Sequence, residues 1–536
     1  FSKHVLTQET RASLASAYAS SLPYLHGVLE KLFDDSLLRK VREEITSALH
    51  FSVKETDIYK ILQTGDLANL DGLPASEAAQ LASLRKLRDA LYSETFRSFL
   101  SDVTGCGPLS GSKTDMSTAS YTNGCHLLNH DDVIGTRRVS YILYLVDPDE
   151  PWEASNGGAL ELYPVLETGT PDVKPSTIIP PKWNNMVFFT VQPGHSFHSV
   201  EEVVVPKNRL SISGWFHAPQ EGEEGYTKEE PEEVQGDAPS SLAQLQAAEE
   251  EPFEPYEEPL DVDALDVLDE KDLAELSQWL NPHYLDTKTL ARVSERFLDE
   301  SSIQLVDFLK KEVIQELAVA TRAADTEDGL LAHRMAPHGT GERGLWRTEG
   351  PPHKHRFMTL STPSPSAPPP ESPSPDPTTT IFTSLHAKLF PSPAFRRWLA
   401  VVTRLCPLSR TGVVRRFRPG LDYTLATSSR SRAVLDATLC AATRVSARDA
   451  ELWASDEVGG YECYMAPHDG EEDPAVYRQM DDDGALLTVS AGWNVLTLVL
   501  RDPGLLKFVK YVSAAAPGSR WDVAFEYDLP PDEEED

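Results

Sequence analysis

Hydrophobic residues in positions 1–100 recur at helical spacing. From Leu22 to Val41 most of them fall three or four positions apart. This period places them on one face of an α-helix. The same spacing returns over 262–335, for example in LAELSQWL and IQLVDFLKKEVIQELAVA. Both regions are therefore predicted to be helical.

Residues 115–217 have a different pattern. The segments RRVSYILYLV, GGALELYPV, NNMVFFTV and RLSISGWFH are short, rich in β-branched and aromatic side chains, and separated by Gly, Pro and Asn. Such segments are typical of strands. Residues 381–528 pass from a helical pattern to a strand-like one in the same way. The predicted fold class is therefore α+β, with two β-rich regions that each follow helices.

An acidic run separates the two β-rich regions. Residues 221–270 hold 19 Asp or Glu and one basic residue, Lys228. A segment of this charge buries too little apolar surface to fold by itself. Residues 221–260 are therefore predicted to form a solvated acidic linker, for which a plain spacer without a specific partner is a sufficient explanation.

A segment of low complexity interrupts the C-terminal half. Eight prolines lie between Pro363 and Pro377, mixed with Ser. Such a sequence builds no core, so we expect a disordered insert at about 334–380. The predicted organisation is an N-terminal domain (1–220), the acidic linker (221–260) and a C-terminal domain (261–536) that ends in an acidic tail (528–536).

Composition narrows the choice of partners. The 536 residues carry 49 Lys or Arg and 84 Asp or Glu, a net charge of −35. An acidic surface repels phosphate, so we expect a basic partner and no direct binding to nucleic acid. The five cysteines form no CxxC pair, which is typical of a reducing compartment. No apolar run approaches 18 residues, so no membrane-spanning helix is predicted.

The second β-rich region looks like a degraded copy of the first, because four segments recur in the same order. The pairs are RSFLSDVTGCGPLS with RRWLAVVTRLCPLS (97–110, 396–409), GGALELY with GGYECY (157–163, 459–464), WNNMVFFTVQPG with WNVLTLVLRDPG (183–194, 493–504) and, more loosely, RLSISGWF with RWDVAFEY (209–216, 520–527). This order predicts two homologous β-domains in one chain.

The first copy contains a set of metal-ligating residue types. His130 and Asp132 precede the strand RRVSYILYLV, and in an extended conformation residues i and i+2 point to the same side. A distant histidine would complete a set of two histidines and one carboxylate. His198 is favoured over His195 for this place because of its spacing to Arg209. Such a set occupies one face of Fe(II) and leaves positions open for a cosubstrate and O2.

Arg209 follows His198 by eleven residues, with Ser211 two positions further on. A planar guanidinium pairs with a carboxylate through two parallel hydrogen bonds. This arrangement suits the far carboxylate of 2-oxoglutarate, whose other end chelates iron. Tyr121 and Tyr144 could bond the same cosubstrate, or could be core residues of a β-barrel.

The repeat supplies an internal comparison for this set. The aligned positions of the second copy lack all three ligands: Thr427 and Ser429 replace His130 and Asp132, and Phe508 replaces His198. Arg520 remains opposite Arg209. The first copy is therefore predicted to be the active domain. The second is predicted to be a catalytically degenerate interaction or scaffold domain.

Four further segments carry a family resemblance: QTGDLANL (63–70), HDDVIGTRRVSYILYLVD (130–147), SNGGALELY (155–163) and SFHSVEEV with NRLSISGWFH (within 196–217). They closely resemble the ribosomal prolyl hydroxylases, which include the yeast termination and polyadenylation protein, its fission-yeast oxygen-sensing relative and their animal counterparts. The resemblance covers nearly the whole chain, and we expect a fungal member. It implies two double-stranded β-helix (jelly-roll) domains with flanking helices, the second inactive.

The resemblance also implies an activity and its residues. The enzyme would be an Fe(II)- and 2-oxoglutarate-dependent prolyl 3-hydroxylase, or a dihydroxylase, that uses O2 and ascorbate. The implied iron ligands are His130, Asp132 and His198, and the implied 2-oxoglutarate pocket contains Arg209, Tyr121, Leu127, Tyr144 and Ser211.

The implied substrate is a proline of the basic small-subunit ribosomal protein at the decoding centre, with effects on translation accuracy and termination. Some members imply localisation in nucleus and cytoplasm, and partners in translation termination or mRNA decay bound by the C-terminal domain. Two alternatives fit the same residues. One is an oxygenase of the same chemistry acting on another protein or a small molecule. The other is an oxygen-sensing scaffold that regulates transcription-factor or mRNA turnover.

Overall fold

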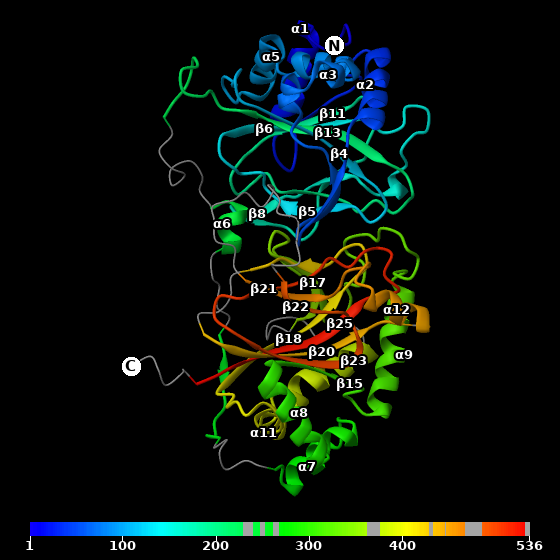
Figure 1. Cartoon of the computed structure of the whole chain (residues 1–536), viewed down its shortest axis with the longest axis vertical. Coiled ribbons are helices and arrows are strands. Elements are labelled where there is room, and N and C mark those ends of the chain that lie inside the picture. The colour runs from blue at the N-terminus through cyan, green and yellow to red at the C-terminus, as the bar shows by residue number, and fades with distance from the viewer. Residues whose placement is uncertain are drawn as a thin grey trace. The chain divides into compact units, whose positions relative to one another are not determined.

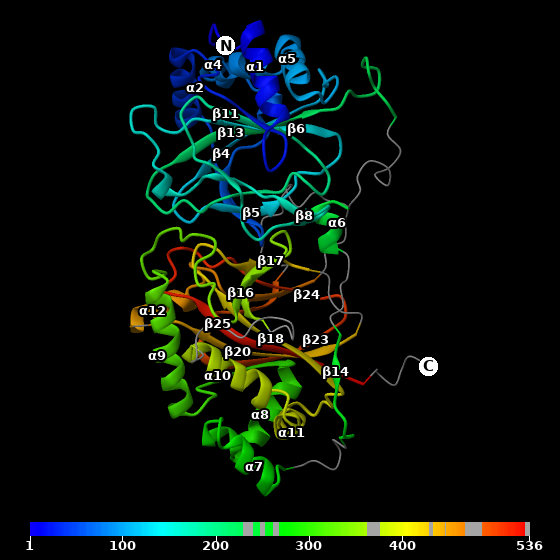
Figure 2. The same ribbon diagram turned by 180° about the vertical axis from the view of Figure 1, so that it is seen from behind.

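The computed structural model of the chain describes residues 1–228, 239–246, 252–260, 267–361, 376–427, 432–444, 446–466 and 485–530. They form two compact units, one built mainly from Phe1–Gln244 and the other from the residues that follow. The elements of each unit can be followed from opposite sides (Figures 1 and 2). Within these ranges no helix is both long and apolar enough to cross a membrane.

The first unit combines helices with antiparallel strands. Its helices are α1 (Gln8–Ala19), α2 (Asp35–Ala48), α3 (Ala75–Gln80), α4 (Ala82–Leu91), α5 (Glu94–Thr104) and α6 (Ser241–Gln246), with 3-10 turns at Leu67–Gly72 and Ala154–Asn156. Its strands are β1 (His26–Leu29), β2 (Ser52–Glu55), β3 (Tyr59–Gln63), β4 (Thr114–Tyr121), β5 (His126–His130), β6 (Arg137–Tyr144), β7 (Leu160–Leu162), β8 (Val165–Glu167), β9 (Thr170–Pro171), β10 (Thr177–Ile179), β11 (Met186–Thr190), β12 (His198–Val200) and β13 (Arg209–His217).

The strand order of the first unit agrees with the predicted jelly roll. Strands β1, β11, β6, β13 and β4 follow one another, as do β5, β12, β7 and β10, and β3 pairs with both β4 and β5. Strands distant in sequence are therefore neighbours in the sheet. The arrangement brings the end of β5, the start of β12 and the start of β13 into one barrel.

Alternation along the strands gives the barrel two different faces. On β11, Phe188 packs in a cluster with Leu38 of α2 and Phe99 of α5, whereas Val187 and Phe189 belong to a separate interior cluster. Successive side chains of a strand point to opposite faces, so this difference is expected. Figure 1 shows α1, α2 and α5 over β6, β11 and β13. The helices cover the outside and leave the interior to the site residues.

The predicted N-terminal helix is wrong around Gly27. This segment is strand β1, in which Gly27 stands opposite Phe188 of β11. A Cβ atom on Gly27 would lie 2.6 Å from the Phe188 ring, so glycine permits the close approach of the two strands. Pro23 also disfavours a helix through this segment. The helical spacing holds from Asp35 onward, where α2 begins after the N-cap Asp34.

The second unit also combines helices with antiparallel strands. Its helices are α7 (Glu270–Leu276), α8 (Thr287–Glu300), α9 (Lys311–Glu327), α10 (Pro377–Ser384), α11 (Pro393–Thr403) and α12 (Ala447–Ala454), with a 3-10 turn at Pro282–Leu285 and a π-helical turn at Leu385–Leu389. Its strands are β14 (Glu254–Pro255), β15 (Ser302–Val306), β16 (Trp346–Glu349), β17 (His355–Leu360), β18 (Ser409–Phe417), β19 (Tyr423–Thr424), β20 (Val434–Ala442), β21 (Glu462–Met465), β22 (Ala485–Val489), β23 (Trp493–Arg501), β24 (Leu506–Val509) and β25 (Arg520–Asp528).

The sheet of the second unit repeats the strand order of the first. The run β15-β23-β20-β25-β18-β17 corresponds to β1-β11-β6-β13-β4-β3, and β22-β21-β24 forms a second, smaller sheet. The four segments that recur in the sequence lie on corresponding elements: α5 and α11, β7 and β21, β11 and β23, and β13 and β25. The two β-rich regions are therefore two copies of one architecture.

Two sequence expectations for the second unit need correction. The stretch IQLV, predicted as helix, is strand β15, which pairs with β23. The insert predicted over 334–380 is too wide, because β16 and β17 lie inside it and continue the sheet. Trp346 and Met358 are buried there, which gives these strands an apolar face despite their polar surroundings. Parts of the predicted linker, insert and tail lie outside the described residues: 229–238, 247–251, 362–375 and 531–536.

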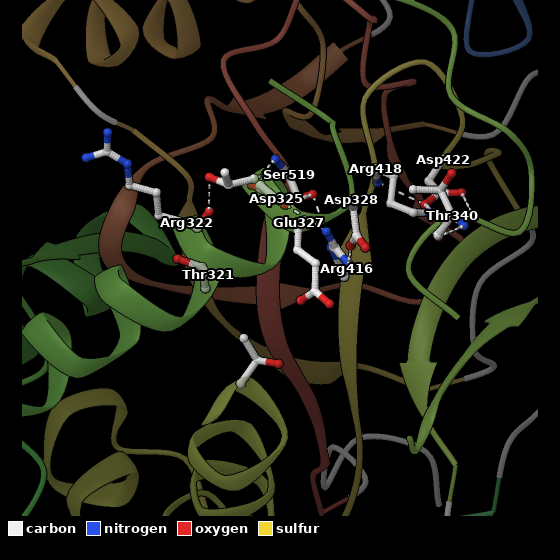
Figure 3. Close-up of polar contacts among 12 residues, drawn as sticks. Thr321, Arg322, Asp325, Glu327, Asp328, Thr340, Arg416, Arg418, Asp422 and Ser519 are labelled. Atoms are coloured by element: carbon white, nitrogen blue, oxygen red, sulfur yellow. Dashed lines mark hydrogen bonds and ion pairs between the residues drawn. The ribbon is translucent and has the colours of Figure 1, made fainter. Parts of the chain in front are cut away.

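Buried ion pairs tie α9 to the sheet of the second unit (Figure 3). Arg416 of β18 lies 2.9 Å from Asp325 of α9 and 2.7 Å from Asp328. Asp325 also accepts a hydrogen bond from the backbone N–H of Ser519, 2.8 Å away. These groups are almost fully buried, so each carboxylate needs its partners and the contact fixes α9 against β18 and β25.

Candidate active site

Three potential metal ligands meet in the first barrel. His130 ends β5 and stands opposite His198, which begins β12. The Nε2 atoms of His130 and His198 each lie 3.4 Å from a carboxylate oxygen of Asp132. One ligand atom from each residue falls within 4.8 Å of the others. His195, the alternative distal histidine, is not part of this group.

The convergence of His130 and Asp132 comes from a turn rather than from strand alternation. Strand β5 ends at His130, and Asp132 has a φ of +61°. This left-handed conformation is uncommon for residues other than glycine. It swings the Asp132 carboxylate back toward the two imidazole rings. Both side chains do lie on one side, as predicted, but this turn brings them together and not the alternation of a strand.

Backbone carbonyls orient both imidazole rings. The Nδ1 of His130 lies 2.9 Å from the carbonyl oxygen of Leu128, and the Nδ1 of His198 lies 2.9 Å from that of Ser196. An Nδ1–H that donates to a carbonyl makes Nε2, which faces Asp132, the nitrogen that can bind a metal once it carries no proton. This outer hydrogen bond is the usual way in which proteins fix a metal-binding tautomer.

The electrostatics of the group set Asp132 and His198, but not His130, in the forms that bind metal. Burial would lower the pKa of His130, but its hydrogen bond to Asp132 and the charge of that carboxylate raise it, so a metal must displace a proton there. Burial would raise the pKa of Asp132, but the charge of His198 and a hydrogen bond from His130 hold it well below its usual range. Burial, followed by the charge of His130, lowers the pKa of His198 to about 4. At neutral pH, Asp132 is therefore a carboxylate and His198 a neutral imidazole, which are the states that coordinate a cation.

Arg209 lies deep in the same barrel at the start of β13. It is 1% exposed. Its Nε donates to the carbonyl oxygen of Gly158 at 2.6 Å, and its Nη1 to the hydroxyl of Ser211 at 3.3 Å. The guanidinium lies 4.6 Å from the ring centre of Tyr121 and 5.0 Å from that of Tyr144. Aromatic faces and neutral oxygens therefore surround a buried cation.

The described residues give Arg209 no carboxylate partner, and its Nη2 atom has no hydrogen bond. A buried cation without an anion is costly, so this position suits an anionic ligand. Gly158 has a φ of +74°, and a Cβ there would lie 2.9 Å from the Arg209 side chain, so only glycine leaves room for it. The donor set and the unpaired arginine together fit Fe(II) and a dicarboxylate.

The remaining predicted residues also line the barrel. Tyr121 and Tyr144 belong to the interior cluster, and Leu127 packs against it. Ser211 stands opposite Tyr144 in the ladder between β13 and β6. The structure therefore places all five predicted cosubstrate residues on the interior side, with Arg209 and Ser211 in direct contact.

Sequence reasoning missed two residues of this site. Tyr24 is buried, its ring lies 5.7 Å from that of Phe189, and within the described residues its hydroxyl has no hydrogen-bond partner. Ser241 belongs to α6 and bonds the side chain of Asp131. Neither residue carries a local signal, because Tyr24 lies in a segment with helical spacing and Ser241 in an acidic run. Gly158, which leaves room for Arg209, did carry a sequence signal, because the second copy has Gly460 at the aligned position.

Comparisons with known families agree with this donor set. Residues 116–217 match the model of the 2OG-Fe(II) oxygenase superfamily. Residues 271–536 match a model described as oxoglutarate and iron-dependent oxygenase degradation C-term. The two matches fall on the first and the second barrel, respectively.

Relatives match over most of the chain. A protein of Ostreococcus tauri named prolyl 3,4-dihydroxylase OGFOD1 is 37% identical over 510 residues, covering 94% of this chain and 95% of its own. Prolyl 3-hydroxylase sudestada1 of Drosophila melanogaster is 29% identical, covering 95% and 84%. Among solved structures, a Pseudomonas putida prolyl-4-hydroxylase is 20% identical with a TM-score of 0.30, covering 39% of this chain and 98% of its own.

Proposed function

We propose, because this chain belongs to the OGFOD1 prolyl hydroxylase family of 2-oxoglutarate- and iron-dependent oxygenases, that its substrate is a proline of the basic small-subunit ribosomal protein at the decoding centre. The family uses Fe(II), 2-oxoglutarate and O2. One observation carries the assignment to the first barrel. The group of His130, Asp132 and His198 shares its interior with a buried arginine that has no carboxylate partner among the described residues.

Each residue then has a defined task. His130, Asp132 and His198 would hold Fe(II) through two nitrogens and one oxygen, which leaves coordination positions for other ligands. Arg209 would bind the far carboxylate of 2-oxoglutarate, with the Ser211 hydroxyl beside it. Tyr121, Leu127 and Tyr144 would exclude water from this pocket. Bound Fe(II) supplies the redox chemistry by which O2 and 2-oxoglutarate yield a hydroxylated proline, succinate and CO2.

Charge supports a basic protein substrate. The chain has a net charge of −35. A cationic ribosomal protein would be attracted to such a surface, and its rate of association should fall as salt rises. The same charge disfavours a nucleic acid as substrate. The names of the relatives describe either one or two hydroxyl groups, so the mass added to the substrate is the informative quantity.

We further propose that the second barrel is catalytically degenerate and binds partners from translation termination or mRNA decay. Its support is the loss of ligand types at the aligned positions Thr427 and Phe508; Ser429 lies outside the described residues. We propose localisation in nucleus and cytoplasm. All five cysteines are free thiols, which suits a reducing compartment.

The test is direct hydroxylation. The full chain would be incubated with Fe(II), ascorbate, 2-oxoglutarate and the decoding-centre ribosomal protein, and the substrate examined by mass spectrometry. We expect the mass of one or two oxygen atoms on a single proline. His130→Ala should abolish this gain. The matched control is His195→Ala, which removes a nearby histidine outside the ligand group and should retain the gain.

The outcomes separate activity from substrate. Succinate formation without added oxygen on the ribosomal protein would keep the oxygenase and overturn the substrate. Absence of both products in the parent chain, with folding intact, would overturn the enzymatic proposal. Equal products in the parent and His130→Ala would overturn the metal assignment.

A further inference from the structure

Helix α6 reaches the metal-ligand turn from the segment predicted to be a solvated linker. The backbone N–H of Ser241 donates to one carboxylate oxygen of Asp131 at 2.9 Å, and its hydroxyl donates to the other at 2.8 Å. Both residues are buried, Ser241 at 8% and Asp131 at 2% exposure. The acidic segment is therefore not simply a spacer: one of its residues is part of the first unit.

A second contact fixes α6 on the same unit. The side-chain amide of Gln244 donates to the carbonyl oxygen of Gly169, 3.2 Å away, in the turn between β8 and β9. Figures 1 and 2, which view the unit from opposite sides, both draw α6 beside β8. The helix is thus held at both ends, by Asp131 at its start and by this turn near its end.

Asp131 is a sensitive place for such a contact. It lies between the ligands His130 and Asp132, and Asp132 has a φ of +61°. For a residue with a side chain this conformation costs about 1 kcal/mol or more, and it persists only where the surroundings impose it. Restraints on the residue before Asp132 are therefore restraints on the direction of its carboxylate.

Asp131 is restrained on its main chain as well as on its side chain. The hydroxyl of Ser196 donates to its carbonyl oxygen at 2.8 Å. The carbonyl of the same Ser196 orients the His198 ring. Asp131 thus joins the turn that presents Asp132 to the loop that presents His198. Ser241 donates to both of its carboxylate oxygens, and the backbone N–H of Val133 donates to one of them at 3.3 Å.

We propose that Ser241 is a positioning residue of the metal centre, which acts through Asp131 to hold Asp132 in its binding conformation. The proposal rests on the proposed function only in taking His130, Asp132 and His198 as the metal ligands. It assigns a segment more than twenty residues beyond the last strand of the first barrel to the catalytic unit. Changes in the linker would thereby alter metal affinity without touching the ligands.

Metal affinity of the full chain tests this directly. The dissociation constant for Mn²⁺ alone would be measured by titration calorimetry on metal-free protein, so that no turnover is needed. Loss of a group that orients a ligand typically weakens metal binding 10- to 100-fold, and we expect about tenfold for Ser241→Ala. Ser241→Thr, which keeps the hydroxyl, should recover most of the affinity. The matched control Ser47→Ala removes a hydroxyl that bonds only its own helix.

A double-mutant cycle separates positioning from a general structural role. Asp131→Ala should weaken binding at least as much as Ser241→Ala, because it also removes the bond from the Ser241 backbone N–H. The double variant should bind no more weakly than Asp131→Ala alone, because that change already removes the hydroxyl's partner. Independent, additive losses would overturn the proposal. So would a Ser241→Ala affinity within twofold of the parent while His130→Ala abolishes binding, and that outcome would leave the proposed function intact. A parent chain that binds no Mn²⁺ would instead overturn the metal site itself.

The melting temperature of the metal-free protein gives the second readout. Removing a buried hydrogen bond lowers the melting temperature with or without metal, so the informative quantity is the rise on addition of Mn²⁺, which a positioning role predicts to be smaller for Ser241→Ala than for the parent chain. If the variant melts lower without metal and gains as much from Mn²⁺ as the parent, the contact is structural and the proposal fails.

Discussion

Arg209 begins β13 in the first barrel, and Arg520 begins the corresponding strand β25 in the second. The two strands hold the same place in their sheets, β13 between β6 and β4, and β25 between β20 and β18. Both arginines are buried. They differ in the next residue on the same face of the strand, which is Ser211 in the first barrel and Asp522 in the second.

The second barrel neutralises its arginine with its own side chains. Arg520 lies 3.0 Å from Glu462 and 2.5 Å from Asp522, and Arg415 contacts both carboxylates. Arg209 has no comparable partner among the described residues. A buried arginine requires an anion, so the origin of the partner carboxylate decides what the arginine does. Where the chain supplies the carboxylate the arginine is structural, and where it does not the arginine is left for a ligand.

The residue at the position of the distal histidine also differs between the two barrels. His198 stands opposite Leu162 in the ladder of β12 and β7, and Phe508 stands opposite Cys463 in the ladder of β24 and β21. Phe508 is buried with Cys463 and Met465 in a small apolar cluster. An imidazole that could ligate a metal in the first barrel thus corresponds to a hydrocarbon ring in the second.

The largest expected effect comes from copying this difference into the first barrel. His198→Phe removes one of three ligands, and the metal contributes several kcal/mol to the transition state, so 2-oxoglutarate turnover should fall roughly 10³-fold or more. Succinate formation measures this. The reciprocal Phe508→His should gain no metal site, because the other ligand types are missing. Metal uptake by a His198→Phe/Phe508→His double variant would show that the second barrel has a site and break the comparison.

Removal of the internal carboxylate should destabilise the second unit. Asp522→Ser, which copies Ser211, leaves Arg415 and Arg520 buried with only Glu462 to share. Removing one partner of a buried ion pair lowers the free energy of unfolding by about 3 kcal/mol or more. Denaturant unfolding followed by hydrogen exchange in β18 and β25 would locate the loss. Unchanged protection in these strands would contradict a structural role for the network.

The parts of this comparison that are local in sequence could be predicted. The repeated segments fall on corresponding elements, because each carries its own alternation of apolar and polar residues. His130, Asp132, His198 and Arg209 could be predicted because their residue types are chemically specific and their spacing is short or repeated. The structure brings the three potential ligands together and places Arg209 against Tyr121 of the same interior cluster.

What depends on distant contacts could not be predicted. Gly27 lies in a strand because it meets Phe188, far along the chain. Helical spacing alone cannot reveal this. Ser241 bonds Asp131, 110 residues away in sequence, from a segment whose only predicted property was its acidic charge. The left-handed φ of Asp132 also has no signature, because aspartate is compatible with several turn conformations.

A smaller effect is expected when the second barrel's carboxylate is placed in the first. Ser211→Asp puts an anion where the serine oxygen already lies 3.3 Å from Arg209. The new carboxylate should pair with the guanidinium and compete with 2-oxoglutarate. A charge-assisted hydrogen bond is worth about 2 kcal/mol, so the KM for 2-oxoglutarate should rise roughly thirtyfold.

Two measurements sharpen this result. The affinity for Mn²⁺ should stay within about twofold of the parent, because the metal ligands are untouched. Ser211→Asn, neutral and of similar size, should raise the KM much less than Ser211→Asp. An equal rise for both variants would assign the effect to size and not to charge, and would remove the proposed parallel with Asp522.

The smallest expected difference is in the response of the two units to pH. Burial, followed by the charge of Glu161, raises the pKa of Glu201 in the first unit to about 8. In the second unit burial would raise the pKa of Glu462, but Lys507 and Arg520 lower it to about 2. The stabilisation that Glu201 contributes is complete below pH 4.5, its usual pKa, and is lost as pH rises through 8. That from Glu462 is present above 4.5 and is lost as pH falls through 2.

The two pKa shifts therefore predict that one unit loses stability as pH rises and the other as pH falls. Between pH 5 and 8 the first unit should lose stability in the parent, and Glu201→Gln should flatten this slope, because glutamine takes up no proton. Between pH 4.5 and 3 the second unit should lose stability, and Glu462→Gln should flatten that slope instead. Hydrogen exchange in β13 and β25, read separately across both windows, measures each unit in the full chain. If Glu201→Gln altered β25, or Glu462→Gln altered β13, the two units would not be titrating independently.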